Sequence, residues 1–262
     1  MSAGEFERTF DNAAAEYDSV RPEYPQALYR DILRYQPLAG ESQALEIGLG
    51  SGKASGPVLD TGCRLTGLEP GGNLAALARK RLGRYPNFTL LEQTLQDYSC
   101  PGGAFNLVYA ATAFHWIPEE YGYQRVYELL KPGGAFARFA YHAGPDRQRV
   151  ELTQEVQELY RRYMNGGKGE YVPLRPEDGE RLLAIPKQHG FVETEFHLYE
   201  MERDFTAQEY LSLLTTYRDH MALDPANREG LFQGICRAIQ RHGGVMTVYY
   251  TVDLELARKP AG

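Results

Sequence analysis

Hydrophobic and polar residues alternate in two different rhythms along the first half of the chain. Short apolar runs of the kind found in strands buried on both faces occupy residues 43–47, 64–68, 88–91, 105–110 and 135–141. Segments with helical periodicity occupy residues 25–36, 53–60, 72–83 and 119–130. Because strands and helices alternate, the pattern predicts an α/β fold with a parallel, doubly wound sheet.

Beyond residue 142 the rhythm changes. The pattern predicts strands at residues 192–201 and 245–257 and helices at 147–164, 178–189, 206–220 and 225–241. A flexible joint is expected at residues 165–171, where glycines are frequent. Ligands of open α/β sheets bind beyond the strand ends, so these helices are expected to form a cap there.

The turn after the first predicted strand carries alternate glycines. Residues 44–52 read Ala-Leu-Glu-Ile-Gly-Leu-Gly-Ser-Gly, which places glycine at positions 48, 50 and 52. Glycine adopts positive φ readily and lets a ligand approach the backbone, so the turn is a candidate nucleotide site. A phosphate-binding P-loop is excluded, because Ile47 and Ala54 stand where that motif needs glycine and a hydroxyl residue.

Two ligands remain open for this turn. A dinucleotide fingerprint would have its third glycine at position 53, where Lys53 stands, which weakens that interpretation without excluding it. S-adenosylmethionine needs a carboxylate or carbonyl near its ammonium group, and Glu46 is suited to that role. Glu69, at the end of the second strand, can accept both ribose hydroxyls of either ligand.

A family resemblance favours the second ligand. The segments "LEIGLGSGKAS", "LTGLEPGGNLAALARKRL", "FNLVYAATAFHWIP" and "LKPGGAFARF" resemble, in order and spacing, the motifs of class I S-adenosylmethionine-dependent methyltransferases. The opening "FDNAAAEYDSVRPEYP" is similar to a bacterial small-molecule branch that includes the trans-aconitate and quinone-biosynthesis methyltransferases. The resemblance covers about residues 1–142. It implies a Rossmann-like sheet with an antiparallel last strand, and S-adenosyl-L-methionine as cofactor.

On this basis the chain is expected to form one methyltransferase domain, 1–262. Its parts are an N-terminal lid and first helix (1–36), a cofactor-binding core (40–142), helical cap insertions (143–190 and 204–243) and closing strands (191–203 and 244–259).

The resemblance also implies the site residues. Arg21 in the lid is expected to bind the methionine carboxylate, and Tyr24 and Trp116 are expected to contact the acceptor. His115 is the candidate base for a phenol or amine acceptor, although it could equally be structural, and a carboxylate acceptor would need no base. The expected cofactor-binding residues are Tyr17, Arg21, Glu46, Gly48, Gly50, Glu69, Pro70, Thr94, Leu95 and Ala111.

Composition and charge limit the classes of substrate and partner that we expect for this chain. The formal net charge is −7 and long basic runs are absent from the sequence, which argues against nucleic acid as the main substrate. The sequence has neither a membrane-length apolar stretch nor an apolar signal core, and its three cysteines lack metal spacing. We therefore expect a cytoplasmic enzyme, monomeric or homodimeric, without a metal, that acts on a small organic acceptor. An NAD(P)-dependent oxidoreductase and a non-catalytic nucleoside-binding module are the alternatives.

Overall fold

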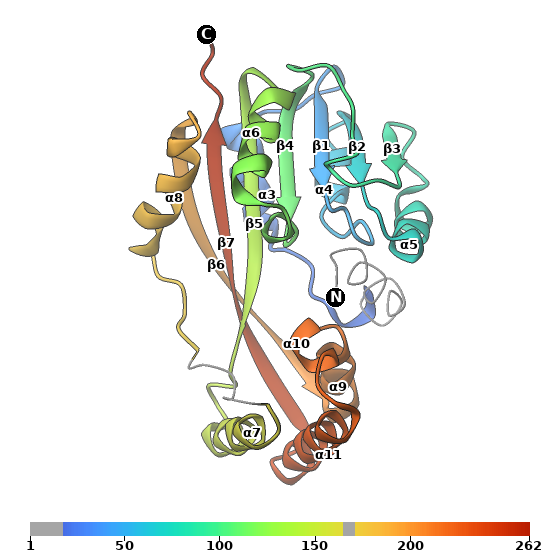
Figure 1. The fold of residues 1–262 in the computed structure, drawn as a ribbon, viewed down its shortest axis with the longest axis vertical. Coiled ribbons are helices and arrows are strands. Elements are labelled where there is room, and N and C mark those ends of the chain that lie inside the picture. Colours follow the sequence, from blue (N-terminus) through green and yellow to red (C-terminus); the bar gives the residue numbers. More distant parts are fainter. Residues whose placement is uncertain (1–17, 165–170) are drawn as a thin grey trace.

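A seven-stranded mixed sheet organises the molecule (Figure 1). The computed structural model describes residues 18–164 and 171–262, apart from the side chain of Arg218. The strand order is β3-β2-β1-β4-β5-β7-β6, and β7 alone runs antiparallel to its neighbours, which confirms the predicted Rossmann-like topology. The strands are β1 (Gln43–Ile47), β2 (Arg64–Leu68), β3 (Phe88–Leu91), β4 (Phe105–Ala111), β5 (Leu130–Gly144), β6 (Val192–Thr206) and β7 (Val245–Arg258).

Helices cover both faces of the sheet. Within the described residues they are α3 (Gln26–Tyr35), α4 (Gly56–Leu59), α5 (Gly72–Leu82), α6 (Glu119–Leu129), α7 (Val150–Tyr163), α8 (Asp178–Gln188), α9 (Ala207–Thr215), α10 (Arg218–Met221) and α11 (Pro225–Arg241), with a 3-10 turn η1 (Phe114–Trp116). Alternate strand residues point to opposite faces of the sheet, so each buried strand contributes side chains to two hydrophobic cores, one on each face. Leu28 of α3 and Leu107 of β4 belong to one core, whereas Val126 of α6 and Val108 of β4 belong to the other.

A third core lies where β5, β6 and β7 extend beyond the other strands. Here α7, α9 and α11 pack on the extended strands and form the cap (Figure 1). On one face of β7, Val252 and Leu254 belong to the core that also contains Leu28 of α3. Met246 and Val248, on the same face, belong to this third core, called the cap core. The cap is therefore built on strands that also belong to the rest of the sheet.

Several predicted elements differ from the structure. Strand β6 continues to Thr206, beyond the predicted end at residue 201. The helix predicted over 206–220 is divided into α9 and α10, and α9 begins at a capping box formed by Thr206 and Glu209. Helix α8, which was expected in the cap, packs instead against the sheet, where Gly179 lies under the ring of Phe196 on β6.

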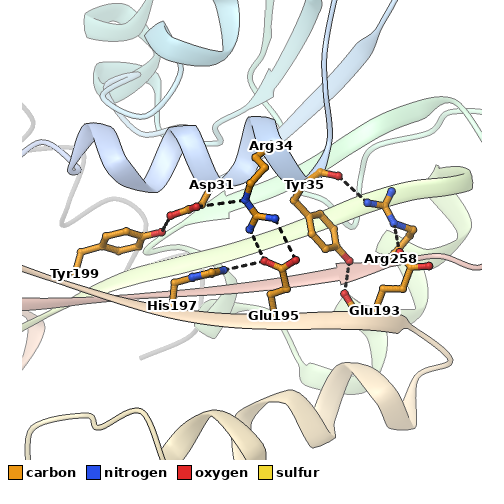
Figure 2. A network of polar contacts seen from close by, with 8 residues as sticks. All are labelled: Asp31, Arg34, Tyr35, Glu193, Glu195, His197, Tyr199 and Arg258. Carbon is orange, nitrogen blue, oxygen red and sulfur yellow. Dashed lines mark hydrogen bonds and ion pairs between the residues drawn. The ribbon is translucent and has the colours of Figure 1, made fainter.

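A polar network attaches α3 to the edge strand β6 (Figure 2). Arg34 donates to Glu195 at 2.5 Å, and the hydroxyl of Tyr199 donates to Asp31 at 2.6 Å. The whole network comprises Asp31, Arg34 and Tyr35 of α3, Glu193, Glu195, His197 and Tyr199 of β6, and Arg258 of β7. Because α3 directly follows residues 18–25, the network fixes the C-terminal end of that segment.

Candidate active site

The glycine turn after β1 has the backbone geometry that its sequence predicts. Gly48, Gly50 and Gly52 all adopt positive φ, at 67°, 59° and 79°. A Cβ on Gly48 would lie 2.5 Å from the Cβ of Ala113, so the turn touches the chain that leaves β4. A Cβ on Gly50 would meet open space within 4 Å, which leaves room for a ligand at the middle of the turn.

Glu69 connects this turn to the one after β2. Its side chain is buried and accepts hydrogen bonds from the amide of Gly50 at 2.7 Å and the amide of Gly71 at 2.8 Å. A carboxylate oxygen can accept more than one hydrogen bond, so the group retains chemistry suited to ribose hydroxyls. Pro70, which follows Glu69, is exposed beside the same turn.

Glu46 lies behind the glycine turn and is fully buried. Its Oε2 accepts hydrogen bonds from the hydroxyls of Ser55 at 2.6 Å and Tyr109 at 2.7 Å, whereas Oε1 has no hydrogen-bond partner among the described residues. Burial raises the pKa of this carboxyl from 4.5 to about 7, although both hydroxyls favour its charged form. A cation placed near Oε1 would oppose that shift.

The segment that precedes α3 is tied to the glycine turn by Asp18. The Asp18 carboxylate accepts from the hydroxyl of Ser51 at 2.6 Å and from Nη2 of Arg81 at 2.7 and 2.8 Å. Lys53 adds an ion pair at 3.8 Å. Lys53 thus contacts the segment of residues 18–25, called here the lid segment. Lys53 stands at the position where a dinucleotide fingerprint would have its third glycine.

Arg21 points toward the cap. Its Nε donates to Oγ1 of Thr216 at 3.0 Å, Nη2 donates to the Thr216 carbonyl at 3.0 Å, and Nη1 donates to the hydroxyl of Tyr141 at 3.2 Å. The guanidinium also lies 4.4 Å from the centre of the Tyr217 ring. These partners belong to β5 and to the region between α9 and α10, so the structure brings Arg21 to the cap side of the site.

A cavity of about 340 Å³ lies between the lid segment and the cap. Its described lining includes Arg21, Thr112, residues 143–145 of the β5 end, and side chains of α7, α9 and β7. Five tyrosines contribute to the wall: Tyr141, Tyr160, Tyr171, Tyr210 and Tyr217. The volume is at the lower end of the range found for small-molecule sites.

Thr112 connects the cavity to the glycine turn, a role that no sequence pattern predicts. It follows β4, lines the cavity, and has φ of 53°, a sparsely populated value for a β-branched residue. Its hydroxyl is 2.6 Å from the hydroxyl of Tyr24, and its amide donates to the Phe139 carbonyl at 2.7 Å. The next residue, Ala113, is the one that touches Gly48.

His115 and Trp116 lie outside this cavity. Both are exposed in η1, with their rings 4.7 Å apart, and neither is among the described lining residues. The pKa of His115 is lowered, mainly by partial desolvation and then by Arg138 and His142. The structure places the hydroxyl of Tyr24 against Thr112 of the cavity wall, although Tyr24, like His115 and Trp116, is not itself among the described lining residues.

The other expected cofactor residues occupy the strand ends. Thr94 donates its hydroxyl to Asp97 at 2.6 Å, and Leu95 is buried in the core under α6. Ala111 ends β4 and packs at the edge of the core under α3. Tyr17 lies outside the described residues.

Membrane-spanning helices and clustered metal ligands are absent from the described residues. Within residues 18–164 and 171–262, no helix has the length and apolar character that a membrane crossing requires. The same residues contain no cluster of three or more His, Cys, Asp or Glu side chains arranged to hold a metal ion.

Comparisons with known proteins agree on one family. Residues 44–134, which hold the glycine turn and strands β1 to β4, match the family described as "Methyltransferase domain". The chain is 28% identical over 180 residues to the Saccharomyces cerevisiae protein "Probable S-adenosylmethionine-dependent methyltransferase CRG1". That alignment covers 66% of this chain and 58% of the yeast protein, so the chain spans under two thirds of that relative's length.

A bacterial relative and a solved structure extend this result. The chain is 28% identical over 109 residues to the trans-aconitate 2-methyltransferase of Deinococcus radiodurans, an alignment that covers 41% of each chain. Its fold is similar to that of phosphoethanolamine N-methyltransferase 2 of Haemonchus contortus, solved with S-adenosyl-L-methionine, at a TM-score of 0.58 and 19% identity. The fold match covers 99% of this chain and 60% of that one.

The glycine turn, the acid at the end of β2 and the matched family agree with the resemblance seen in the sequence, and the nicotinamide-dependent alternative finds no support among these relatives. Residues 44–134 thus match the methyltransferase domain family, and the fold of the chain is similar to that of a methyltransferase solved with S-adenosyl-L-methionine.

Proposed function

We propose that this protein transfers a methyl group from S-adenosyl-L-methionine to a small organic acceptor held in the cavity under the cap. The observation that carries the proposal is the adjacency of Thr112 and Ala113. Thr112 lines the cavity, whereas Ala113 touches Gly48 of the cofactor turn. Two consecutive residues therefore connect the two compartments that a methyl transfer requires.

The residues around the turn fit the cofactor. Gly50 offers open space, and Glu69 presents a carboxylate for the ribose at the end of β2. The buried Oε1 of Glu46, which has no hydrogen-bond partner among the described residues, suits the ammonium group of the methionine part. Pro70, Thr94, Leu95 and Ala111 remain proposed cofactor contacts at the neighbouring strand ends. A role for Tyr17 is proposed from the sequence alone.

The bound cofactor supplies an electrophilic sulfonium methyl, so the protein mainly needs to position the acceptor. The bond to the acceptor forms as the methyl–sulfur bond breaks, and the electron pair stays on sulfur. The lid segment supports this role, because Asp18 attaches it to the turn and Arg21 attaches it to the cap. A lid held at both ends keeps water from the reacting atoms.

Proton removal is needed only for a protonated acceptor. Its proton would pass to solvent or to a nearby base, and His115 remains a proposed base for a phenol or an amine. Its lowered pKa keeps the imidazole neutral near pH 7. Because His115 is not among the described lining residues, this role requires η1 to move toward the cavity. Trp116 would approach the acceptor in the same movement.

Calorimetric titration tests the first half of the proposal. We expect S-adenosylmethionine and its demethylated product to bind with micromolar affinity and NADH to bind at least about a hundredfold more weakly. Tight binding of NADH, with no binding of the other two ligands, would overturn it. Release of the demethylated product with a panel of phenols, amines and small acids then tests catalysis. Binding of the cofactor without turnover on any acceptor would support the non-catalytic alternative.

The proposal includes a small-molecule acceptor and excludes nucleic acid, in keeping with the net charge of −7. A cytoplasmic, monomeric or homodimeric protein is proposed from the sequence. Light scattering of the purified chain measures its assembly state directly.

A further inference from the structure

We infer that Arg21 binds the carboxylate of a flat, monoanionic acceptor, and that the atom that receives the methyl group lies at the opposite end of that acceptor. The inference rests on the proposed function and names the substrate class for its cavity. It also changes the role expected for Arg21, from a contact of the cofactor to a contact of the acceptor.

The charge of the cavity wall is the first support. Among the described lining residues, Arg21 is the one with a formal charge at neutral pH, and no acidic side chain is present in that described set. Tyr160 and Tyr210 stay neutral, because burial raises the pKa values of both phenols above the usual 10. The one unit of positive charge in the described part of the wall suits a carboxylate, whereas a phosphate dianion would favour further cations.

The second support is the way the guanidinium is held. Arg21 is buried, and its three described hydrogen bonds go to a hydroxyl, a backbone carbonyl and a phenol. The ring of Tyr217 lies against the guanidinium plane at 4.4 Å. A guanidinium fixed in this way loses little side-chain entropy when it binds an anion, and low solvent access strengthens the attraction.

The aromatic wall of the cavity indicates the shape of the acceptor. Tyrosine rings present flat apolar faces with polar tips, and five of them line a cavity of about 340 Å³. This shape suits a planar ring or a conjugated chain with polar substituents. A flexible or highly branched acceptor would make fewer face contacts.

The direction of the acceptor follows from the two ends of the cavity. Thr216 and Tyr217 hold Arg21 at the cap end, between α9 and α10 (Figure 1). Thr112 marks the other end, beside the residue that touches the glycine turn. Tyr141 lies between them, because its hydroxyl accepts from Arg21 and its ring is 5.7 Å from that of Tyr24. The carboxylate thus faces the cap, and the opposite end faces the methyl donor.

A matched pair of ligands tests the charge. 4-Hydroxycinnamate and its neutral amide have the same shape and differ in the group that would meet Arg21. Calorimetry with the wild-type protein saturated with the demethylated cofactor should give at least about tenfold tighter binding of the acid. Equal binding of acid and amide, or binding of neither, would overturn the inference.

Variants of Arg21 test whether this residue causes the preference for the acid over the amide. Arg21→Met should reduce the preference for the acid to less than about threefold, while the Kd of the demethylated cofactor stays within about twofold. Arg147→Met is the matched control, since Arg147 pairs with Glu200 and is not among the described lining residues. Retention of the full preference by Arg21→Met would refute the assignment. Arg21→Lys keeps the charge and provides a second variant should the methionine protein not fold, and it should retain part of the preference.

A crystal structure of the complex with both ligands tests the direction. We expect the carboxylate on Arg21 and the phenol oxygen toward the sulfur of the demethylated cofactor. A carboxylate that faces the sulfur would overturn the direction and indicate methyl-ester formation. Failure to bind the cofactor itself would instead count against the proposed function, so the two ideas fail by different observations.

Discussion

The hydroxyl of Tyr24 lies 2.6 Å from the hydroxyl of Thr112, and this contact joins the lid segment to the exit of β4. Thr112 has positive φ, a conformation that costs a β-branched residue of the order of 1–3 kcal/mol and persists only where surrounding contacts hold it. Tyr24 supplies one of those contacts and the amide bond to the Phe139 carbonyl supplies another. The conformation of Thr112 on the cavity wall therefore depends on its contact with Tyr24.

Replacement of Tyr24 by phenylalanine tests this coupling. The variant loses a part-buried hydrogen bond, so its free energy of unfolding should fall by about 1 kcal/mol and kcat should fall about tenfold or more. Tyr29→Phe is a matched control, because Tyr29 also packs on Phe139 and its buried hydroxyl has no hydrogen-bond partner among the described residues. That control should be as stable as the wild type or more stable, with unchanged kcat. Denaturant melts and product assays measure both quantities, and equal effects in the two variants would contradict the coupling.

Asp18→Asn should loosen the lid at its cofactor end. The carboxylate accepts from Ser51 and Arg81 and pairs with Lys53, and the amide would lose the charge that all three favour. We expect the dissociation rate of the demethylated cofactor, followed by stopped-flow fluorescence, to rise about tenfold. Asp60→Asn serves as control, since Asp60 accepts from Tyr85 away from the turn. An unchanged dissociation rate would show that the Asp18 contact does not retain the ligand.

Glu69→Gln changes the group that connects the two turns. One carboxylate oxygen becomes an NH₂ group that faces the amide of Gly50 or Gly71, so a hydrogen bond becomes a repulsive contact. Calorimetry should show the Kd of S-adenosylmethionine raised by about tenfold or more. Glu92→Gln alters a nearby exposed ion pair with Arg79 and should leave that Kd within about twofold. Similar affinities for both variants would remove Glu69 from the cofactor site.

Glu46→Gln should make stability less sensitive to pH. The unfolded carboxyl ionises above its ordinary pKa of 4.5, whereas in the folded protein the pKa is raised to about 7. The wild type therefore loses stability as pH rises from about 4.5 to about 7, by up to about 3 kcal/mol from this group. The difference in unfolding free energy, variant minus wild type, should grow across that interval and then level off. Glu255, with a similarly raised pKa, is present in both proteins and cancels.

The cofactor-free protein should be used for those denaturant melts, because a bound ammonium would lower the pKa of Glu46 and reduce the effect. A difference that is constant or decreases with pH would show that the carboxyl is already ionised in the folded state.

The His115→Ala variant tests whether His115 acts as a general base or has no part in catalysis. In the described structure His115 is exposed and outside the cavity lining, so for an acceptor that is already ionised kcat should stay within about threefold of wild type. For a phenol acceptor, a fall of about a hundredfold or more, with loss of the acidic limb of the pH profile, would establish η1 movement and a base role. Acceptor Kd values, measured alongside, separate binding from proton transfer.

Much of the fold was predictable because apolar runs and turn residues are local signals. Residues 107–111 are a continuous apolar stretch, and they form most of a strand buried on both faces. The later part of β6 was missed because Glu200, Glu202 and Asp204 interrupt the hydrophobic pattern. In the structure those acids occupy the exposed face of an edge strand, while Phe205 faces the cap core.

The backbone geometry of the candidate site was predictable where conformation dictates the residue type. The positive φ values of Gly48 and Gly50 agree with their place in the turn, and Glu69 lies at the strand end where it was expected. The direction of Arg21 was not predictable, because its partner Thr216 is 195 residues away in the sequence. Thr112 has no local signal, since a β-branched residue with positive φ is imposed by its tertiary contacts.

The continuity of β7 through both cores limits how such an enzyme can diversify. A cap inserted in a surface loop can be exchanged between homologues as a module. This cap instead shares strand β7 with the rest of the sheet, so its replacement would also replace Val252 and Leu254 of the other core. New acceptor preferences would then arise by point changes on the inner wall, such as at Met246 or Val248, and grafted caps would give chimaeras that fail to fold.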